Sequence, residues 1–156
     1  MEEDKESKRV LNEKQTANKA VEILLDKKIG FKILSPKEKK NLAIAFARKN
    51  MVIYGNAYDI IHCRKKIDFS NEKEIEEKLD AISVYEIKST NRKEMKKDFS
   101  GYFFDLTTAE LLVAQSLKEH FKFAFVNTIT EEYFELSLNE VFAKSKGIYP
   151  KWAIRF

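Results

Sequence analysis

The sequence predicts a protein of the α/β class, because helical and β-forming segments alternate along a single chain of 156 residues. Capping boxes at Ser35–Glu38 and Thr107–Glu110 mark where two helices should begin. Short runs rich in β-branched and aromatic residues, such as residues 82–90, favour strands. No internal repeat or linker divides the chain, so we expect one domain over residues 1–156.

Composition narrows the class of protein further. A hydrophobic content of 44% and twelve phenylalanines exclude a disordered chain. No apolar run approaches the ~20 residues that a membrane span needs, and residues 1–5 lack the apolar segment of a signal peptide. Cys63 is the single cysteine, which excludes an internal disulfide and a multi-cysteine zinc site. We therefore expect an intracellular, cytoplasmic protein with no membrane partner.

Charge is distributed unevenly along the chain. Residues 27–49 hold eight lysines and arginines against one glutamate, a net charge of +7. Residues 101–145 hold three lysines against seven acids, a net charge of −4. A basic half that faces a polyanion suits a nucleic-acid binder, although lysine-rich helices are more often simply solvated.

The expected elements follow from periodicity and turn signals. In the first half we expect a frayed or weakly helical segment at residues 1–12, a helix over 13–28, a strand over 31–34, a helix over 36–49 and a strand over 51–54. In the second half we expect a strand over 58–66, a loop or short helix over 71–80, a strand over 82–90, a basic loop over 92–97, a helix from Thr107, strands over 123–126 and 133–136, a helix over 138–144 and an edge strand over 152–156. Trp152 and the phenylalanines of the C-terminal half are expected in the core.

The strand over residues 82–90 carries a carboxylate and an ammonium on one face. Side chains alternate across a strand, so Glu86 and Lys88 point to the same side, ~6–7 Å apart. A lone Glu-x-Lys pair is usually a solvated ion pair on an edge strand. A catalytic interpretation needs a second acid from another segment.

Asp59 is the best second acid. If residues 58–66 pair antiparallel with residues 82–90 so that Asp59 faces Glu86, then Ile61 faces Val84 and the two acids lie at the end of an apolar patch. The opposite face then holds the apolar side chains of Tyr58, Ile60, Tyr85 and Ile87. Two other acids fit less well: Asp80 lies ~20 Å along the strand from Glu86, and Asp68 lies near the far end of the hairpin.

Two converging carboxylates repel each other unless a positive charge lies between them. Mg²⁺ binds through one or two carboxylates and keeps several waters, which suits Asp59 and Glu86. Such a metal makes a bound water easier to deprotonate and a phosphoryl oxygen more electrophilic. Lys88 could orient or deprotonate that water, or stabilise the negative charge of the transition state.

These residues resemble a known superfamily. Tyr58-Asp59-Ile60-Ile61, followed by the run from Tyr85 to Thr90, is similar to the PD-(D/E)xK nucleases, which include restriction endonucleases and Holliday-junction resolvases. The segment from Phe104 to Val126 also resembles the helix and strand that follow the motif in restriction-type members.

The resemblance implies a restriction-endonuclease-like core, with a central mixed β-sheet flanked by helices. It also implies hydrolysis of DNA phosphodiester bonds with Mg²⁺, for which Mn²⁺ can substitute. Asp59, Glu86 and Lys88 would be the catalytic residues, and Asp59 and Glu86 would be the metal ligands.

The chain departs from the family pattern at two positions. Tyr58 stands where many members have proline, and the acid that many members take from the first helix is either Glu13 or Glu22, with neither favoured. Phosphate contacts are expected from the basic segment after the motif, namely Asn91, Arg92, Lys93, Lys96 and Lys97, although a solvated loop is about equally compatible.

Several alternatives stay open. An enzyme that cuts both strands of DNA is expected to act as a homodimer or with a partner subunit. A restriction enzyme and a resolvase or repair nuclease fit the length equally well, and DNA specificity is not indicated. The alternative is a non-catalytic basic module for nucleic-acid binding or assembly on the same fold, with the acids in structural ion pairs.

Overall fold

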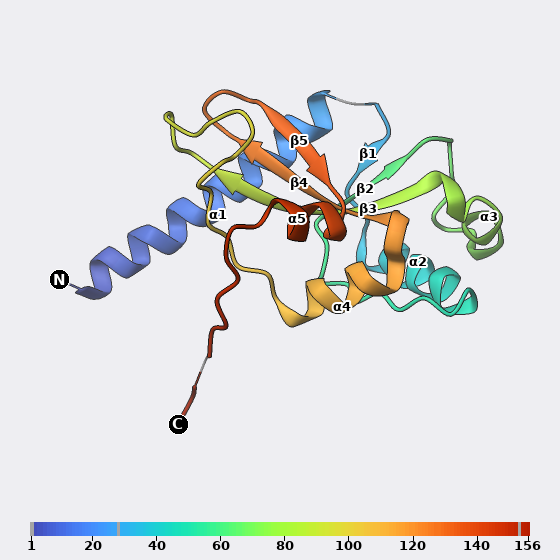
Figure 1. Ribbon diagram of the computed structural model, residues 1–156. Coiled ribbons are helices and arrows are strands. Elements are labelled where there is room, and N and C mark those ends of the chain that lie inside the picture. Colours follow the sequence, from blue (N-terminus) through green and yellow to red (C-terminus); the bar gives the residue numbers. More distant parts are fainter. Residues whose placement is uncertain (1, 28, 153) are drawn as a thin grey trace.

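Five strands form one mixed sheet, and they lie side by side in the order in which they occur in the chain (Figure 1). The computed structural model describes residues 2–27, 29–152 and 154–156. The strands are β1 (Phe31–Lys32), β2 (Ile60–Cys63), β3 (Ile82–Thr90), β4 (Phe121–Asn127) and β5 (Tyr133–Leu136). Only β3 and β4 are parallel, and the other neighbours are antiparallel. The α/β class expected from the sequence is therefore confirmed.

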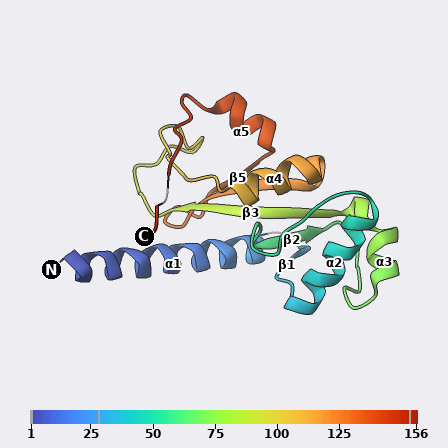
Figure 2. The ribbon, with the colours of Figure 1, turned by 90° about the horizontal axis from the view of Figure 1, so that it is seen from below.

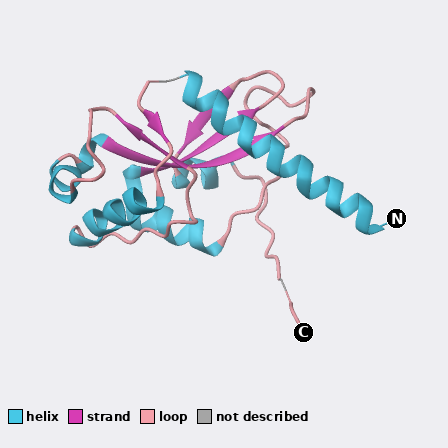
Figure 3. Cartoon of the chain, turned by 180° about the vertical axis from the view of Figure 1, so that it is seen from behind, coloured by secondary structure: helices cyan, strands magenta, loops and turns pink. Residues whose placement is uncertain are grey.

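Helices cover both faces of the sheet (Figure 2). They are α1 (Glu2–Lys27), α2 (Pro36–Arg48), α3 (Glu72–Glu77), α4 (Thr108–Leu117) and α5 (Leu138–Lys144), with single turns of 3₁₀-helix at Leu79–Ala81 and Lys118–His120. α1 lies across one face (Figure 3), where Ala20 and Leu24 pack against Tyr85. α2, α4 and α5 cover the opposite face, where their apolar side chains join Val84 and Phe123 in the larger core. Within the described residues, no helix is long and apolar enough to cross a membrane.

The capping boxes begin their helices as expected. Ser35 and Glu38 cap α2 reciprocally, and Thr107 and Glu110 do the same for α4. A third box, Ser137 with Glu140, begins α5. Each capping box is formed within four consecutive residues, so the start of each helix can be predicted from the local sequence.

The register between β2 and β3 is the one expected from the sequence. Ile61 pairs with Val84 and Cys63 pairs with Ile82. Just before β2, the backbone N–H of Asp59 donates to the carbonyl of Tyr85 at 2.9 Å. Asp59 therefore lies at the end of this pairing, one residue before Ile60, which pairs with Tyr85.

Three expected strands differ in the structure. β1 and β2 are shorter than expected, because pairing stops at Lys32 and at Cys63. Residues 51–54 form no strand, since their backbone is bonded to helices instead. The N–H of Met51 donates to the carbonyl of Phe46, and the N–H of Val52 donates to Ser116 Oγ. At the other end of the chain, α1 begins at Glu2, so the backbone of residues 2–12 is helical where a frayed or weakly helical segment was expected.

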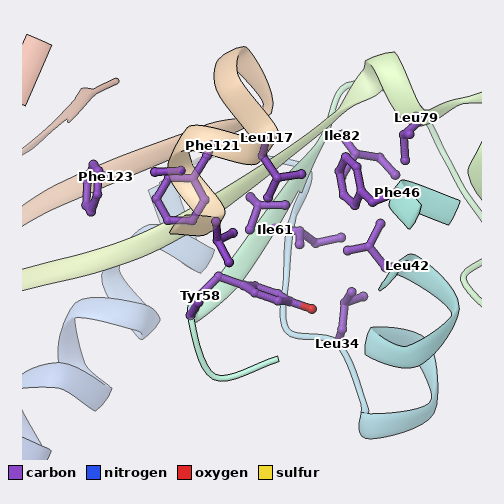
Figure 4. Close-up of a cluster of buried hydrophobic side chains, with 14 of the residues drawn as sticks. Leu34, Leu42, Phe46, Tyr58, Ile61, Leu79, Ile82, Leu117, Phe121 and Phe123 are labelled. Carbon is purple, nitrogen blue, oxygen red and sulfur yellow. The ribbon is translucent and has the colours of Figure 1, made fainter. Parts of the chain in front are cut away.

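Two further expectations are wrong. Tyr58 does not share a face with Ile60 and Tyr85, because it precedes β2 and escapes the strand alternation. Its ring lies in the larger core, and Figure 4 shows its hydroxyl directed toward Leu34. Trp152 is 88% exposed rather than buried. The described residues of the segment 152–156 form no edge strand, because the chain leaves the sheet after α5 (Figure 1), and residue 153 lies outside the described part.

Candidate active site

Asp59, Glu86 and Lys88 come together on the sheet face that α2, α4 and α5 cover. β3 presents Glu86 and Lys88 on the same face as Val84, which belongs to the larger core. Asp59 enters from the chain just before β2, and its Oδ2 accepts a hydrogen bond from the backbone N–H of Ile87 at 2.8 Å. This bond fixes the Asp59 carboxylate beside Glu86, at a solvent-exposed rim of the site.

Lys88 lies between two carboxylates. Its Nζ is 3.1 Å from Glu86 Oε1 and 2.8 Å from Glu110 Oε2. The three side chains are only 11%, 12% and 8% exposed, respectively. They therefore form a buried, charge-assisted network, in which each hydrogen bond is stronger than an exposed one.

Glu110 is the site residue that sequence reasoning missed. Its capping box with Thr107 was recognised, but only as the start of a helix. In the structure, Glu110 Oε2 accepts from the backbone N–H of Thr107 at 3.1 Å and from Lys88 Nζ at 2.8 Å. The cap therefore anchors the start of α4 against the carboxyl-terminal half of β3. The sequence did contain a signal for this residue, because Glu110 is the capping acid of the helix that follows the Glu-x-Lys strand.

The surroundings of Glu86 disfavour its charged form. Burial, then the neighbouring Asp59, raise the pKa of Glu86 to about 8, although Lys88 acts to lower it. Partial desolvation by the atoms packed around its carboxylate is the main reason that the pKa of Asp59 is raised, although the residue reaches the solvent-exposed rim. On β4, the residues in register with Glu86 and Lys88 are the buried Phe123 and Phe125, which supply an apolar wall.

The surroundings of Lys88, in contrast to those of Glu86, favour its charged form. Burial acts to lower its pKa, but the carboxylates of Glu86 and Glu110 outweigh that effect and raise the pKa above its usual value. The side chain therefore stays an ammonium at neutral pH. This charge state suits the stabilisation of negative charge better than the removal of a proton from water.

The donor set fits a divalent cation held by two carboxylates. Asp59 lies close enough to Glu86 that its negative charge contributes to the raised pKa of Glu86. Oxygen ligands of this kind, with waters that complete the shell, are what Mg²⁺ prefers. Among the described residues, no group of three or more His, Cys, Asp or Glu side chains is arranged to hold a metal ion. Asp59 and Glu86 are the two oxygen ligands that this end of the site could offer to a cation.

α2 contributes a further cation beside the site. Lys39 Nζ donates to the carbonyl of Gly55 at 3.1 Å and lies 4.6 Å from the centre of the Tyr58 ring. Tyr58 directly precedes Asp59, and the positive charge of Lys39 acts to lower the pKa of Asp59. The chain between α2 and β2 therefore joins Lys39 to the candidate site.

The basic segment expected to contact phosphates follows the end of β3. The segment with Asn91, Arg92, Lys93, Lys96 and Lys97 begins beyond the carboxyl end of β3, which is Thr90. Asn91 follows Glu86 by five residues. Lys97 forms an ion pair with Glu132 at 2.9 Å, in the turn between β4 and β5.

The first helix does not supply a third acid. Glu13 and Glu22 are exposed on α1, which covers the face opposite to Glu86 and Lys88. Glu110 of α4 is the additional acid on the side of the site. Chemically, the arrangement offers two carboxylates for a cation, one ammonium for a developing negative charge, and one acid that orients the ammonium.

Comparisons of this chain with protein-family models, with curated proteins and with solved structures find no match.

Proposed function

We propose that this protein is a metal-dependent DNA endonuclease with a site of the PD-(D/E)xK type on a restriction-endonuclease-like core. The observation that carries the proposal is that Asp59 accepts the backbone N–H of Ile87 and lies beside Glu86, with Lys88 on the same face of β3. The order of elements also agrees with the family, since a helix, a strand, the strand that Asp59 directly precedes, the Glu-x-Lys strand, a helix and a strand follow in turn. α2 and α3 are additions within that order.

In this proposal, Asp59 and Glu86 hold Mg²⁺, or Mn²⁺ in its place. When bound, the metal would lower the pKa of a coordinated water and polarise the phosphoryl oxygen. Lys88, kept cationic by Glu86 and Glu110, neutralises the charge that develops on the scissile phosphate. Glu110 touches Lys88 and acts through it, so it is a positioning residue.

The second candidate is a non-catalytic nucleic-acid-binding or assembly module. It is favoured by the closed network in which Lys88 bonds to both Glu86 and Glu110, an arrangement that a buried structural ion cluster would also adopt. Under this alternative, the acids would stabilise the junction of β3 with α4 and would bind no metal.

Cleavage assays separate the two candidates. Supercoiled plasmid and branched DNA are incubated with the protein and Mg²⁺, with EDTA as the control. Glu86→Gln and Asp59→Asn are expected to abolish metal-dependent cleavage while both proteins stay folded. Cleavage by both variants at the wild-type rate would remove this site from consideration. Substrate preference, and sedimentation with and without DNA, would show whether a homodimer or a partner subunit is needed.

A further inference from the structure

The substrate strand needs a basic surface next to the candidate site, and the segment over residues 91–97 is one candidate for it. Successive phosphates of one strand are ~3.4 Å apart along the helix axis. Phosphates that flank the scissile bond therefore lie close to it, whereas this segment begins beyond the carboxyl end of β3, five residues after Glu86. Lys97 is in addition paired with Glu132. Phosphates that flank the scissile bond require cations closer to Asp59.

α2 provides such cations. Its first turns carry Lys37, Lys39 and Lys40 against one acid, Glu38, whose carboxylate is bonded to Lys32 at 2.6 Å and to the backbone N–H of Ser35 at 2.8 Å. Glu38 is therefore neutralised locally, and this end of α2 presents a net positive charge.

A groove separates this end of α2 from the turn that leads into β2. Its volume is about 490 Å³, and its lining includes Leu34, Lys39, Lys40, Gly55 and Asn56. Lys39 reaches across it to the carbonyl of Gly55. The lining combines apolar side chains with two ammonium groups and an amide, and Asp59 follows Asn56 by three residues. A sugar-phosphate backbone, with apolar sugars between charged phosphates, matches this combination.

We propose that the groove between α2 and the turn at residues 54–57 binds the phosphates of the substrate strand that flank the scissile bond, with Lys39 and Lys40 as their principal contacts. The proposal rests on the proposed nuclease function and names the surface that would hold its nucleic acid. Lys39 holds the phosphate nearer to Asp59, because its ammonium already lies against Tyr58. Lys40 is exposed and takes the next phosphate outward.

The test measures DNA binding without catalysis. A fluorescein-labelled DNA duplex and the corresponding single strand are titrated with protein in EDTA over a series of salt concentrations, and anisotropy gives the affinity. The variants are Lys39→Gln with Lys40→Gln, and Lys96→Gln with Lys97→Gln as the competing surface. Lys65→Gln with Lys66→Gln is the matched control, because these adjacent lysines are exposed and follow the far end of β2. Lys40→Gln is also tested alone, because Lys39 has structural contacts whose loss could affect folding. The melting temperature of every variant is measured.

Loss of Lys39 and Lys40 is expected to weaken duplex binding at least ~10-fold near 0.1 M salt and to reduce the slope of log K against log[salt] by ~1.8, or ~0.9 per contact. Lys40→Gln alone should remove about half of that slope. If the Lys39/Lys40 variant binds like the wild type, or if only the Lys96/Lys97 variant weakens, the groove proposal is overturned while the nuclease proposal stands. If the wild-type protein binds no form of DNA, the nuclease proposal itself fails.

Discussion

The carboxylate of Glu110 lies 2.8 Å from the ammonium of Lys88, although 22 residues separate the two in the sequence. The same oxygen of Glu110 also accepts the N–H of Thr107. One side chain therefore begins a helix and orients the cation of the candidate site. Local helix formation and site geometry are coupled through this atom, and the coupling can be measured.

Glu110→Ala should reduce both stability and activity, whereas Glu140→Ala should reduce stability only slightly. Both residues complete capping boxes, but Glu140 is exposed on α5 and Glu110 is buried against Lys88. Loss of Glu140 should lower the free energy of unfolding only slightly, because water can replace the hydrogen bond of an exposed cap. Loss of Glu110 breaks a buried ion pair and should cost ~3 kcal/mol.

Urea denaturation measures both costs, and single-turnover cleavage measures the activity. Glu110→Gln keeps an acceptor for Thr107 but removes the charge beside Lys88. It should retain more stability than the alanine variant and still cleave at least ~10-fold more slowly than the wild type. Equal activity of Glu110→Gln and wild type would contradict the positioning role.

Glu86→Gln should change how stability depends on pH. The folded-state pKa of Glu86 is about 8, against a usual value of 4.5, so the folded chain binds a proton that the unfolded chain has released between these pH values. Stability therefore falls as the pH rises through this window, and Glu86→Gln removes that fall. In EDTA at pH 8.5, the variant should be more stable than the wild type by more than ~1 kcal/mol, the equivalent of about one pKa unit.

A divalent cation should act in the opposite direction. Because it would bind the ionised Glu86 in the folded state, Mg²⁺ should raise the melting temperature of the wild type at pH 8.5 and leave that of Glu86→Gln unchanged. Melting curves with Mg²⁺ and with EDTA, at pH 5 and pH 8.5, cover all four conditions. An equal effect of Mg²⁺ on the two proteins would argue against Glu86 as a ligand.

Lys88→Ala should lower the single-turnover rate by ~10²–10³, since a well-placed electrostatic donor is worth that much. DNA affinity should fall by no more than one phosphate contact. Lys88→Arg should rescue poorly, because the planar guanidinium fits differently between Glu86 and Glu110. Rate, affinity and melting temperature are measured on the same three proteins. Cleavage by Lys88→Ala at the wild-type rate would contradict this mechanism.

Tyr58→Phe should stabilise the fold. The Tyr58 hydroxyl is buried and has no hydrogen-bond partner among the described residues. Its removal should therefore raise the free energy of unfolding by ~1 kcal/mol, because the cost of burying an unsatisfied polar group is lost. The ring and its contact with Lys39 remain. Tyr85→Phe is the matched control, because the Tyr85 hydroxyl donates to Glu135 at 3.1 Å and its loss should destabilise. Thermal melts compare the two, and a lower melting temperature for Tyr58→Phe would show that its hydroxyl is satisfied.

The parts of this fold that depend on neighbouring residues could be predicted from the sequence. Capping boxes place the starts of α2 and α4 because four adjacent residues determine them. The β2–β3 register was chosen to bring Asp59 to Glu86, and the pairs that it implied, Ile61 with Val84 and Cys63 with Ile82, are confirmed. The alternation of core-facing residues supports that register because a slip of one residue would move Ile61 to the other face.

The parts that depend on tertiary packing could not be predicted. Glu110 meets Lys88 only because the chain returns after β3 and starts α4 against the same strand. Tyr58 faces the larger core because β2 begins two residues later, at Ile60, which periodicity cannot locate. The ion pair of Lys97 with Glu132 likewise joins two segments that are far apart in the sequence, so no local pattern indicates it.

Trp152 has a practical consequence for the unfolding experiments. It is the single tryptophan in the sequence and is almost fully exposed, on a segment that has left the sheet. Its indole is hydrated in the folded protein as well as in the unfolded one, so intrinsic tryptophan fluorescence will scarcely register the loss of the core. Far-ultraviolet circular dichroism, which follows the helices and the sheet, is the suitable optical signal for every stability comparison.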